Sequence, residues 1–553
     1  MSLVKLIADQ LRKTPFFIPL REVYSIFSPR LRALRIEEQA DLNRITFKVK
    51  DALQNPLNGP NGLCKNVLIM GMGRVRFIAQ EAAIRKSFEL AGFRCKVIVP
   101  QDSMVIKAYR RLGSDNLIFL DHYQASVPSE GAQMLSDCKT IDDIINLTSD
   151  GVRCGKYALS TLMRKKRTGS FNLNDSSIRK ELAIALDRSL QCAFTASVLI
   201  KECKPNALVL VDRGYSPSGE LFDLCIKNDI PVFTWNAAHR NNSLMLKRYD
   251  RSNIDVHPSS LSKDTWEQIL TLPWSSQKKD LVLQELESCY ASGEWYSEVG
   301  TQVNKVSVGK EALINQLGLD PKKKTVAIFP HIFWDATFFW GKDLFSNYEE
   351  WFVESVRAAC KNTSVNWLVK VHPANIVKNN RDGVSSEHSE ISAIRQAIGE
   401  LPSHVKLLKA DTNISTHSLF KIIDSCVTVR GTTGIEASCF GIPVLTAGTG
   451  RYDRLGFTID SDSREEFISL LADIHNLPRL TPMQNELALK YAWGVLIGRP
   501  VSLQVYQMRY NSTKTADLEI DFQVSTADAV RQSPDLKLIA SWIKSDAEDF
   551  MNW

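Results

Sequence analysis

The sequence predicts an α/β protein with two Rossmann-like domains that face each other across a cleft. Short apolar segments alternate with helical patterns over residues 61–260, and the same alternation returns over 319–480. Such alternation is typical of a parallel sheet covered by helices. Polar and basic residues follow several of the apolar segments, at the strand ends where open α/β sheets bind ligands.

Length and composition define the broad class. A chain of 553 residues is too long for one ordinary core, so we expect two or three domains. Its 24% charged and 44% hydrophobic residues are typical of a soluble globular protein. The 11 cysteines form no C-x-x-C pair, which argues against a zinc site or a disulfide framework and favours a reducing cytosol.

Nothing in the sequence predicts insertion into or export across a membrane. No apolar run approaches the roughly 20 residues that span a bilayer. The apolar stretch at the N-terminus is too short for a signal peptide. We therefore expect a cytoplasmic location.

The N-terminal segment is the most basic part of the chain. Residues 1–35 contain seven lysines and arginines and two acidic residues, a charge of +5 within a net charge of +6. The segment is also rich in leucine, isoleucine and phenylalanine. Basic, apolar segments can lie on anionic membranes. We expect contact with the inner face of the cytoplasmic membrane or, alternatively, a helical subdomain packed on the body of the protein.

The first domain is expected to begin with an apolar strand that is covered on both faces. A glycine turn, Gly71–Arg74, follows this strand, and Asp175 or Ser176 can cap a long helix. The expected strands are 66–70, 95–100, 117–120, 207–211 and 231–235, and the expected helices are 77–92, 176–200 and 219–228.

A helical linker and the second domain follow. Linker helices are expected at 264–272, 279–293 and 309–317. The second domain is expected to contain strands at 325–329, 367–371, 405–408, 426–429 and 444–445, with helices at 347–360, 389–399, 417–424, 434–440 and 463–475. The remaining C-terminal residues have helical and irregular patterns and are expected to cross back onto the first domain.

The segment Lys370-Val371-His372-Pro373 comes directly after the apolar residues Trp367–Val369. An imidazole at this strand end can donate a hydrogen bond to a phosphate oxygen, and Lys370 shares the strand face of His372. Pro373 fixes the turn. A single histidine is more often structural, but a second polar segment favours contact with a ligand.

That second segment is Arg430-Gly431-Thr432-Thr433-Gly434-Ile435-Glu436, with a helix expected to begin near Gly434. Threonine at a helix start is usually a cap, yet two hydroxyls, two glycines and Arg430 exceed what capping requires. A helix N-terminus adds unpaired N–H groups that suit phosphate. Glu436 can reach a ribose diol or, alternatively, only stabilise the helix start.

Together with Gly441-Ile442-Pro443-Val444, these segments resemble motifs of bacterial capsule and O-antigen polysaccharide glycosyltransferases of the GT-B fold. The chain is similar to the capsule polysaccharide biosynthesis family, which includes Kdo transferases, and more distantly to teichoic-acid glycerophosphotransferases and bacterial sialyltransferases. Those groups pair a His-Pro motif with a later Ser/Thr motif around the donor phosphates. Thr432-Thr433 stands here in place of two serines. The resemblance covers 325–460 well and 205–240 loosely.

The resemblance implies that the two domains bind different substrates. Residues 1–60 would form a basic helical leader, 61–318 the acceptor domain with its linker, 319–490 the donor domain, and 491–553 a helical segment that packs back on the first domain. The implied donor-binding residues are His331, Lys370, His372, Arg430, Thr432, Thr433, Gly434 and Glu436. Positive charge and N–H donors would stabilise the leaving phosphate in place of a metal, so we expect neither a metal nor another cofactor.

The resemblance implies that the loop Pro330–Asp335, after the first strand of the second domain, also faces the cleft. Asp335 in this loop is a candidate for binding sugar hydroxyls or for acid/base catalysis. Four aromatic residues in and after the loop are expected to form a platform for a sugar or, alternatively, to pack between the domains: Trp334, Phe338, Phe339 and Trp340.

A general base for the acceptor hydroxyl should come from the first domain. Asp212 ends a strand there and is the first candidate, with Glu220 and His239 behind it. A carboxylate at a strand end is often only a turn residue. The glycine turn is not a G-x-G-x-x-G motif, because Arg76 replaces the third glycine, but its neighbourhood supplies candidates for acceptor binding: Gly73, Arg74 and Arg76.

Motifs of several other classes are absent or have a simpler explanation. The sequence contains no P-loop and no H-E-x-x-H motif. Asp460-Ser461-Asp462 resembles a metal-binding D-x-D motif, but Ser463–Glu466 directly after it is typical of a helix capping box. Basic clusters such as Lys322–Lys324 are too short to predict nucleic-acid binding.

We therefore expect a glycosyltransferase that moves a sugar from a nucleotide donor to a growing capsule or O-antigen (lipopolysaccharide) glycan. Its partners would be a nucleotide sugar and a glycan or lipid-linked glycan. The alternatives are a polyol-phosphate transferase, a non-catalytic polysaccharide-assembly subunit and a sugar-nucleotide 2-epimerase. The basic leader fits the epimerase poorly, because an enzyme with a soluble substrate gains nothing from a membrane-facing segment.

Overall fold

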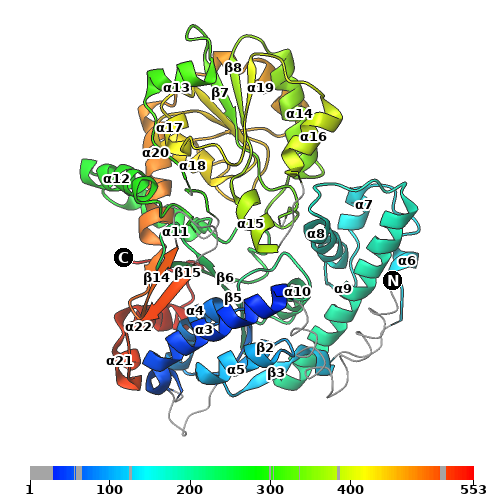
Figure 1. The fold of residues 1–553 in the computed structure, drawn as a ribbon, viewed down its shortest axis with the longest axis vertical. Helices are drawn as coiled ribbons and strands as arrows, with labels where there is room; N and C mark the ends of the chain where they lie inside the picture. Colours follow the sequence, from blue (N-terminus) through cyan, green and yellow to red (C-terminus); the bar gives the residue numbers. More distant parts are fainter. Residues whose placement is uncertain are drawn as a thin grey trace.

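Figure 1 shows two α/β domains stacked along the long axis of the molecule in a computed structural model. The structure describes residues 29–54, 57, 65–123, 128–297, 300–302, 304–335, 337–382, 387–510 and 518–553. Residues that follow strands of both sheets line one cavity, so the carboxyl ends of the two sheets face each other across a cleft. This arrangement is the predicted GT-B architecture.

The first domain has a Rossmann-like sheet with an antiparallel edge. Within the described residues the strand order is β13-β6-β5-β4-β1-β2-β3. These strands are β1 (Lys65–Met70), β2 (Phe93–Val99), β3 (Leu117–Phe119), β4 (Ala207–Leu210), β5 (Val232–Ala237), β6 (Ser243–Tyr249) and β13 (Val501–Ser502). The strands β1 to β5 pair in parallel, whereas β6 runs antiparallel to β5 and β13. The order reverses between β1 and β4.

Strand β6 was not predicted, because its charged residues look exposed in the sequence. Lys247 lies in the middle of β6 and is fully buried. Its Nζ atom lies 2.7 Å from a carboxylate oxygen of Asp549, which is also buried. The partner that makes this burial possible lies 302 residues further along the chain.

Helices cover both faces of the first sheet. They are α4 (Val75–Leu90), α5 (Ser103–Arg111), α6 (Gly131–Met134), α7 (Ile141–Ile145), α8 (Cys154–Lys166), α9 (Ser176–Cys203) and α10 (Ser218–Lys227). Asp175 caps α9 as predicted, since its side chain accepts a hydrogen bond of 2.8 Å from the N–H of Ser177.

By length and composition alone, α9 could cross a membrane, which the sequence analysis did not anticipate. Core helices of globular domains pass the same test. Leu182, Leu186 and Leu199 on α9 are buried in the core of the first domain, and the helix packs on α8, α10 and α6. We therefore treat α9 as a helix of the first domain.

The sheet of the second domain repeats the strand order of the parallel part of the first sheet but is parallel throughout. Among the residues described, its strand order is β12-β11-β10-β7-β8-β9. The strands are β7 (Thr325–Ile328), β8 (Asn366–Lys370), β9 (Val405–Leu408), β10 (Ser425–Thr428), β11 (Val444–Thr446) and β12 (Ile459–Asp460). The helices are α14 (Tyr348–Lys361), α15 (Ala374–Asp382), α16 (Ser389–Ala397), α17 (Thr416–Leu419), α18 (Thr432–Cys439) and α19 (Arg464–Ala472). The order reverses between β7 and β10.

The linker contains the three predicted helices, α11 (Lys263–Thr271), α12 (Ser276–Ser292) and α13 (Lys310–Leu317). After α20 (Pro482–Trp493), which packs on α12 of the linker and α18 of the second domain, the C-terminal segment reaches the first domain, where α22 (Pro534–Lys544) packs on α4. The segment is not only helical, however. Besides α21 (Ala527–Gln532), it contains an antiparallel pair, β14 (Tyr506–Tyr510) and β15 (Leu518–Phe522). Alternate residues of β14, Tyr506 and Met508, are buried in the core of the first domain.

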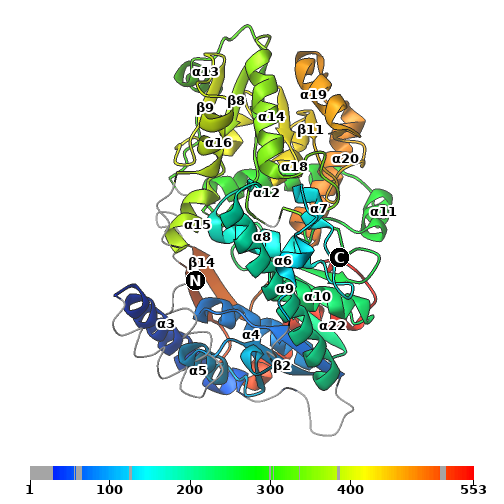
Figure 2. The same cartoon turned by 90° about the vertical axis from the view of Figure 1, so that its right-hand side faces the viewer.

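The described part of the expected leader is a packed helix, α3 (Pro29–Leu53). Leu42, Ile45 and Val49 on this helix are buried in the core of the first domain, and Figure 2 shows α3 beside α4 and α5. This matches the alternative of a helical subdomain. Residues 1–28 lie outside the described residues, so membrane contact through 1–35 stays a prediction.

Candidate functional site

The predicted motifs meet where the strand order reverses in each sheet. In the second domain, His331 follows β7, His372 follows β8, and the segment Arg430–Thr433 follows β10. In the first domain, Asp212 follows β4, which pairs with β1 at the reversal. The carboxyl ends of strands at such a point form the crevice in which α/β proteins bind ligands.

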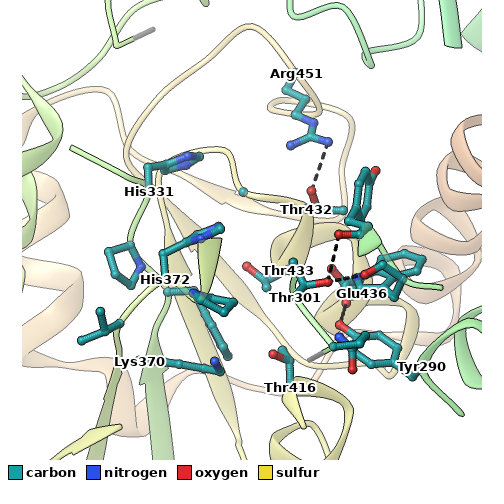
Figure 3. Close-up of a pocket in the computed structure, with 18 of the residues that line it drawn as sticks. Tyr290, Thr301, His331, Lys370, His372, Thr416, Thr432, Thr433, Glu436 and Arg451 are labelled. Atoms are coloured by element: carbon teal, nitrogen blue, oxygen red, sulfur yellow. Dashed lines mark hydrogen bonds between the residues drawn. The ribbon is translucent and has the colours of Figure 1, made fainter. Parts of the chain in front are cut away.

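Two neighbouring cavities occupy the cleft. The inner cavity, drawn in Figure 3, has a volume of about 250 Å³ and is walled by the second domain and the linker. The outer cavity, of about 390 Å³, also includes first-domain residues such as Asp212 and Asn236. Six residues line both cavities and form what we call the shared wall: His257, Tyr296, His331, His372, Thr432 and Arg451.

His372 and His257 present the same chemical group to the shared wall. Each stands in a Val-His-Pro sequence, and its Nδ1 accepts a hydrogen bond from the backbone N–H two residues later, at 3.2 Å from Ala374 and 3.1 Å from Ser259. This hydrogen bond places the ring proton on Nε2. Burial and nearby positive groups lower the pKa of His372 to about 3 and that of His257 well below its usual range. Both rings are therefore neutral N–H donors, suited to bind a phosphate oxygen.

His331 is neutral as well, but its proton lies on the other nitrogen. Its Nε2 accepts a hydrogen bond of 3.2 Å from the backbone N–H of Arg430, and its ring stacks on Tyr348 with centroids 4.6 Å apart. Burial and then the charge of Arg430 lower the pKa of His331 well below its usual range. His331 thus also lines the cavities as an N–H donor.

Thr432 and Thr433 are the first two residues of α18, which begins two residues earlier than predicted. Gly431 stands at the N-cap position and supplies no side-chain cap, so the N–H groups of the first turn face the cavity together with the threonine hydroxyls. Gly434, a predicted donor-binding residue, lines neither cavity. A Cβ atom at Gly434 would lie 2.2 Å from the Tyr452 hydroxyl, so this glycine admits Tyr452 against the helix.

Arg430 was predicted to bind the ligand, but its buried guanidinium also contacts other residues of the second domain. Its side chain is only 2% exposed, and although it borders the outer cavity, its guanidinium is committed to other groups. It forms an ion pair with Asp343 and donates to the Tyr348 hydroxyl at 3.2 Å. Arg430 therefore anchors the loop after β10, and its backbone N–H orients His331.

Arg451 supplies the positive charge that was expected from Arg430. Its guanidinium donates to the backbone oxygen of Arg430 at 3.0 Å and to the Thr432 hydroxyl at 3.3 Å, and it lines both cavities. Figure 3 shows Arg451 extending toward Thr432. This arginine follows β11, so its place after a strand was a signal that the sequence contained.

Glu436 lines the inner cavity, and its contact with a ribose stays a prediction. It is 1% exposed, and one carboxylate oxygen accepts a hydrogen bond of 2.5 Å from the Tyr290 hydroxyl. Burial raises the pKa of Glu436 to about 7, although the hydrogen bond from Tyr290 opposes this rise. The carboxyl group can therefore both donate and accept hydrogen bonds near neutral pH, which suits a diol.

We expect Glu436 to reduce the stability of the unliganded protein as the pH rises. Between its reference pKa of 4.5 and about 7, the folded protein keeps a proton that the unfolded chain has lost, so stability falls across this window. Glu436→Gln can still accept from Tyr290 but does not titrate. From pH 5 to pH 8, the free energy of unfolding of this variant should rise relative to that of wild type by up to about 3 kcal/mol. The measurement is the melting temperature of both proteins across this pH range. A difference in melting temperature that is constant with pH would contradict this.

Asp212 and Asp335 both line the outer cavity, but their environments differ. The surrounding protein raises the pKa of Asp212, whose side chain is still 47% exposed to the cavity. Burial alone would raise the pKa of Asp335 as well, but the ion pair with Lys378 and the hydrogen bond of 2.9 Å from Tyr215 hold it well below its usual range. Asp212 is therefore the better proton acceptor, and Asp335 is a fixed negative charge.

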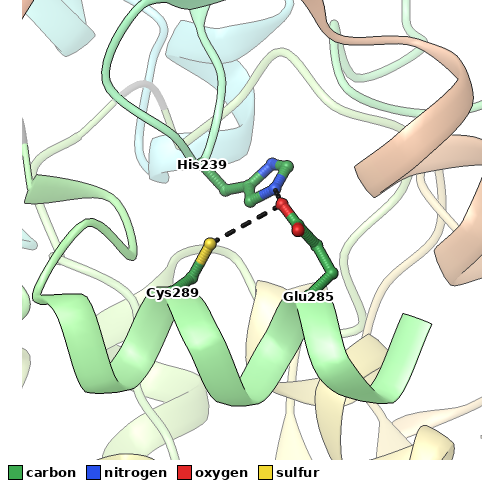
Figure 4. Close-up of side chains that lie close together, drawn as sticks. All are labelled: His239, Glu285 and Cys289. Atoms are coloured by element: carbon green, nitrogen blue, oxygen red, sulfur yellow. Dashed lines mark hydrogen bonds and ion pairs between the residues drawn. The ribbon is translucent and has the colours of Figure 1, made fainter. Parts of the chain in front are cut away.

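His239, another candidate base, lines neither cavity. Figure 4 shows it grouped with Glu285 and Cys289, donor types that can hold a metal ion. Glu285 accepts a hydrogen bond of 2.7 Å from each of two guanidinium nitrogens of Arg240 and lies 2.7 Å from His239 Nε2. The charge of Arg240 opposes a cation at this position. His239 instead ties the connection between β5 and β6 to α12.

Glu220 and the glycine turn after β1 also lie away from the cavities. Glu220 is buried in α10 and accepts hydrogen bonds from Ser189 at 2.6 Å and Ser216 at 2.5 Å. Acidic side chains of α3 occupy the start of α4, where an anionic ligand would otherwise bind. Glu38 accepts from the N–H of Val75 at 2.7 Å, and Arg76 pairs with Glu37 and Asp41. Neither Gly73 nor Arg74 lines the inner or the outer cavity.

The aromatic residues after β7 serve mainly to join the domains. Trp334, Phe338 and Phe339 are buried in the hydrophobic core of the first domain, although they belong to the second. Trp340 alone among the four lines the outer cavity. Interdomain packing, the alternative to a sugar platform, is therefore the role of the other three.

Sequence reasoning missed the linker residues that wall the inner cavity. Tyr290, Trp295 and Tyr296 come from α12 and the loop after it. Tyr296 adopts a φ of 44°, a left-handed conformation that is uncommon for a bulky residue and often marks a functional site. His257, which was also missed, did have a signal in the sequence, because Val-His-Pro at 256–258 repeats that of 371–373.

Comparisons with known proteins find similarity only among solved structures. No protein-family model and no curated protein sequence matches this chain. One similar structure is Thermosulfurimonas dismutans KpsC, a beta Kdo 2,4 transferase, at 14% identity and a TM-score of 0.33, over 54% of this chain and 82% of that chain.

Two further similar structures are sugar-nucleotide epimerases. The UDP-GlcNAc 2-epimerase of Neisseria meningitidis, bound to UDP-GlcNAc, matches at 11% identity and a TM-score of 0.26 over 78% of this chain and 97% of that chain. The UDP-GlcNAc 2-epimerase of Methanocaldococcus jannaschii matches at 13% identity and a TM-score of 0.24 over 76% and 97%. At these identities and TM-scores, the similarity assigns no activity to this chain.

Proposed function

We propose that this protein is a glycosyltransferase that moves a sugar from a nucleotide donor to a growing bacterial surface polysaccharide, a capsule or O-antigen glycan. The shared wall carries the proposal. It brings three neutral imidazoles, two hydroxyl groups and one guanidinium together between two cavities. Such a set of donors suits a phosphate group that is in contact with both substrates.

The inner cavity would hold the nucleotide donor. Its phosphate would lie at the N-terminus of α18, within reach of Thr432, Thr433 and Arg451, and its ribose would lie near Glu436. As the bond between the sugar and the phosphate oxygen breaks, negative charge collects on the phosphate. Arg451 and the N–H donors of the shared wall are already in place to stabilise that charge, which is the role a metal has elsewhere.

The outer cavity would hold the acceptor glycan. The acceptor hydroxyl would attack the anomeric carbon while Asp212 takes its proton, and the nucleotide would leave with the bonding electrons. Asp335, held by Lys378 and Tyr215, would orient the acceptor. A 2-epimerase acts on a single substrate and needs no such second cavity, so the outer cavity favours transfer.

The cellular setting is part of the same proposal. The protein would act in the cytoplasm, at the inner face of the membrane where lipid-linked glycans are extended. The charge of +5 on residues 1–35 supports this location, because anionic lipid surfaces attract basic segments.

A thermal-shift experiment with CMP, CDP, UDP, GDP and dTDP tests the donor site. A nucleotide that binds the folded protein should raise its melting temperature by mass action. We expect one class of nucleotide to stabilise wild type and to have a much weaker effect on His372→Ala, which lacks the Nε2–H donor. If no nucleotide stabilised wild type, the proposal would fail in favour of a non-catalytic assembly subunit.

A further inference from the structure

The end of the inner cavity that lies far from Arg451 differs in chemistry from the phosphate end. Figure 3 shows Lys370, Thr416 and Tyr290 at this end, and Arg451, His331 and Thr432 at the other. Aromatic rings such as Phe329 and Trp295 also line this cavity. A flat, largely apolar ligand group with a few polar atoms fits such surroundings.

Lys370 is the unusual residue here. It stands at the end of β8 and is only 3% exposed, and its Nζ atom has no hydrogen-bond partner within the described residues. A buried amine without a partner costs free energy, and native proteins seldom keep one without a reason. The neighbouring Lys305 cannot accept a hydrogen bond from Lys370, and its positive charge opposes a charge on Lys370. Lys305 itself donates to backbone oxygens of the loop at 410–412. The free Nζ therefore marks the place of an acceptor atom that a ligand supplies.

We propose that Lys370 binds a carbonyl oxygen of the donor's nucleobase, so that the site takes a uracil, cytosine or guanine nucleotide and discriminates against adenine. This inference rests on the proposed function. Burial and the nearby charge of Lys305 lower the pKa of Lys370 to about 7 in the unliganded protein. An acceptor atom on the base edge would favour the ammonium form, which has three donors and no acceptor. A keto oxygen projects from the ring and offers two lone pairs. Adenine instead carries an amino donor outside the ring, and its acceptors are ring nitrogens with one lone pair each.

The phosphate is not the partner of Lys370, because the phosphate-binding groups lie elsewhere in the cavity. Thr432, Thr433 and Arg451 cluster at the start of α18. Glu436, one turn further into that helix, is held by Tyr290 and occupies the place of the ribose. A nucleotide bound with its phosphate at the helix start and its ribose at Glu436 would direct its base toward Lys370. The side chains of Thr416 and Gln302 also line the cavity and can donate or accept hydrogen bonds to the rest of the base edge.

The test compares the binding of UMP, CMP, GMP, AMP and ribose 5-phosphate by calorimetry to wild type, Lys370→Met and Arg451→Met. We expect at least one keto-base nucleotide to bind wild type about tenfold or more tightly than AMP. Lys370→Met should weaken that nucleotide about 10- to 100-fold, the range for hydrogen bonds to charged groups, and leave ribose 5-phosphate unchanged. Arg451→Met, the matched control at the phosphate end, should weaken all five ligands alike.

The melting temperature without ligand shows whether Lys370→Met is folded. Methionine is close in shape to lysine and removes the buried amine that has no partner among the described residues, so Lys370→Met should melt at a higher temperature than wild type without ligand. The inference is overturned if Lys370→Met weakens ribose 5-phosphate as much as the nucleotides, or leaves all ligands unchanged. If wild type binds every nucleotide equally, the inference fails and the proposed function stands. If wild type binds none of them, both fail.

Discussion

Replacing Asp212 with asparagine is expected to lower the rate of sugar transfer by about 10²- to 10⁴-fold, the usual contribution of a general base. Asparagine keeps the shape of the side chain and can still accept the hydrogen bond of 2.9 Å from the N–H of Gly214. It cannot take the proton of the acceptor hydroxyl. The measurement is the turnover number for acceptor-dependent nucleotide release, together with the dissociation constant of the nucleotide, which should not change.

Asp335→Asn is the matched control for this prediction. This substitution leaves Lys378 without its ion-pair partner, so it should lower the melting temperature and reduce turnover less than Asp212→Asn does. The opposite pattern would contradict the assignment. If Asp335→Asn abolished transfer in a stable protein while Asp212→Asn retained full activity, Asp335 would be the base.

Replacing Arg430 with methionine is expected to destabilise the second domain by about 3 kcal/mol, because it leaves Asp343 with an uncompensated charge. For a domain of this size, that loss corresponds to a fall in melting temperature of roughly 5–10 °C. Burial already raises the pKa of Asp343 to about 6 against the opposing effect of Arg430. The loss of stability in Arg430→Met should therefore be smaller at pH 5, where the carboxyl group of Asp343 takes up a proton, than at pH 8.

Arg451→Met tests whether Arg451, rather than Arg430, is the arginine that binds the ligand. Its guanidinium forms no ion pair within the described part of the chain, and its side chain lines both cavities. We expect a melting temperature close to that of wild type and a clear loss of stabilisation by nucleotides. If Arg430→Met were stable but unable to bind nucleotide, the roles of the two arginines would have to be exchanged.

Much of the fold could be predicted because each strand is a short apolar segment followed by a polar residue. The strand 405–408 has the predicted bounds, and 207–211 and 325–329 differ from β4 and β7 by one residue. The failures involve partners that are distant in sequence. Strand β6 carries Lys247, whose burial depends on Asp549. The pair β14 and β15 is stabilised by packing on the first domain, which local propensity does not reveal.

The sequence was enough to predict which histidine, threonine and glutamate residues line the cavity, because they lie at strand ends or in the first turns of a helix. His372 follows β8, Thr432 and Thr433 begin α18, and Glu436 lies one turn into α18; all four line the inner cavity. The direction of a long side chain could not be predicted. Arg430 and Arg451 both follow strands, and only the packing of Asp343 and Tyr348 decides which guanidinium remains in the cavity.

The most direct test of the account is the mass of an acceptor glycan after incubation with the protein and the nucleotide sugar whose nucleotide binds. Lipid-linked or synthetic surface-polysaccharide fragments serve as acceptors, and Asp212→Asn serves as the negative control. The account predicts that the acceptor gains the mass of one sugar residue, that one equivalent of nucleotide is released, and that the variant does neither. An acceptor of unchanged mass beside a sugar nucleotide that is isomerised or intact would contradict it.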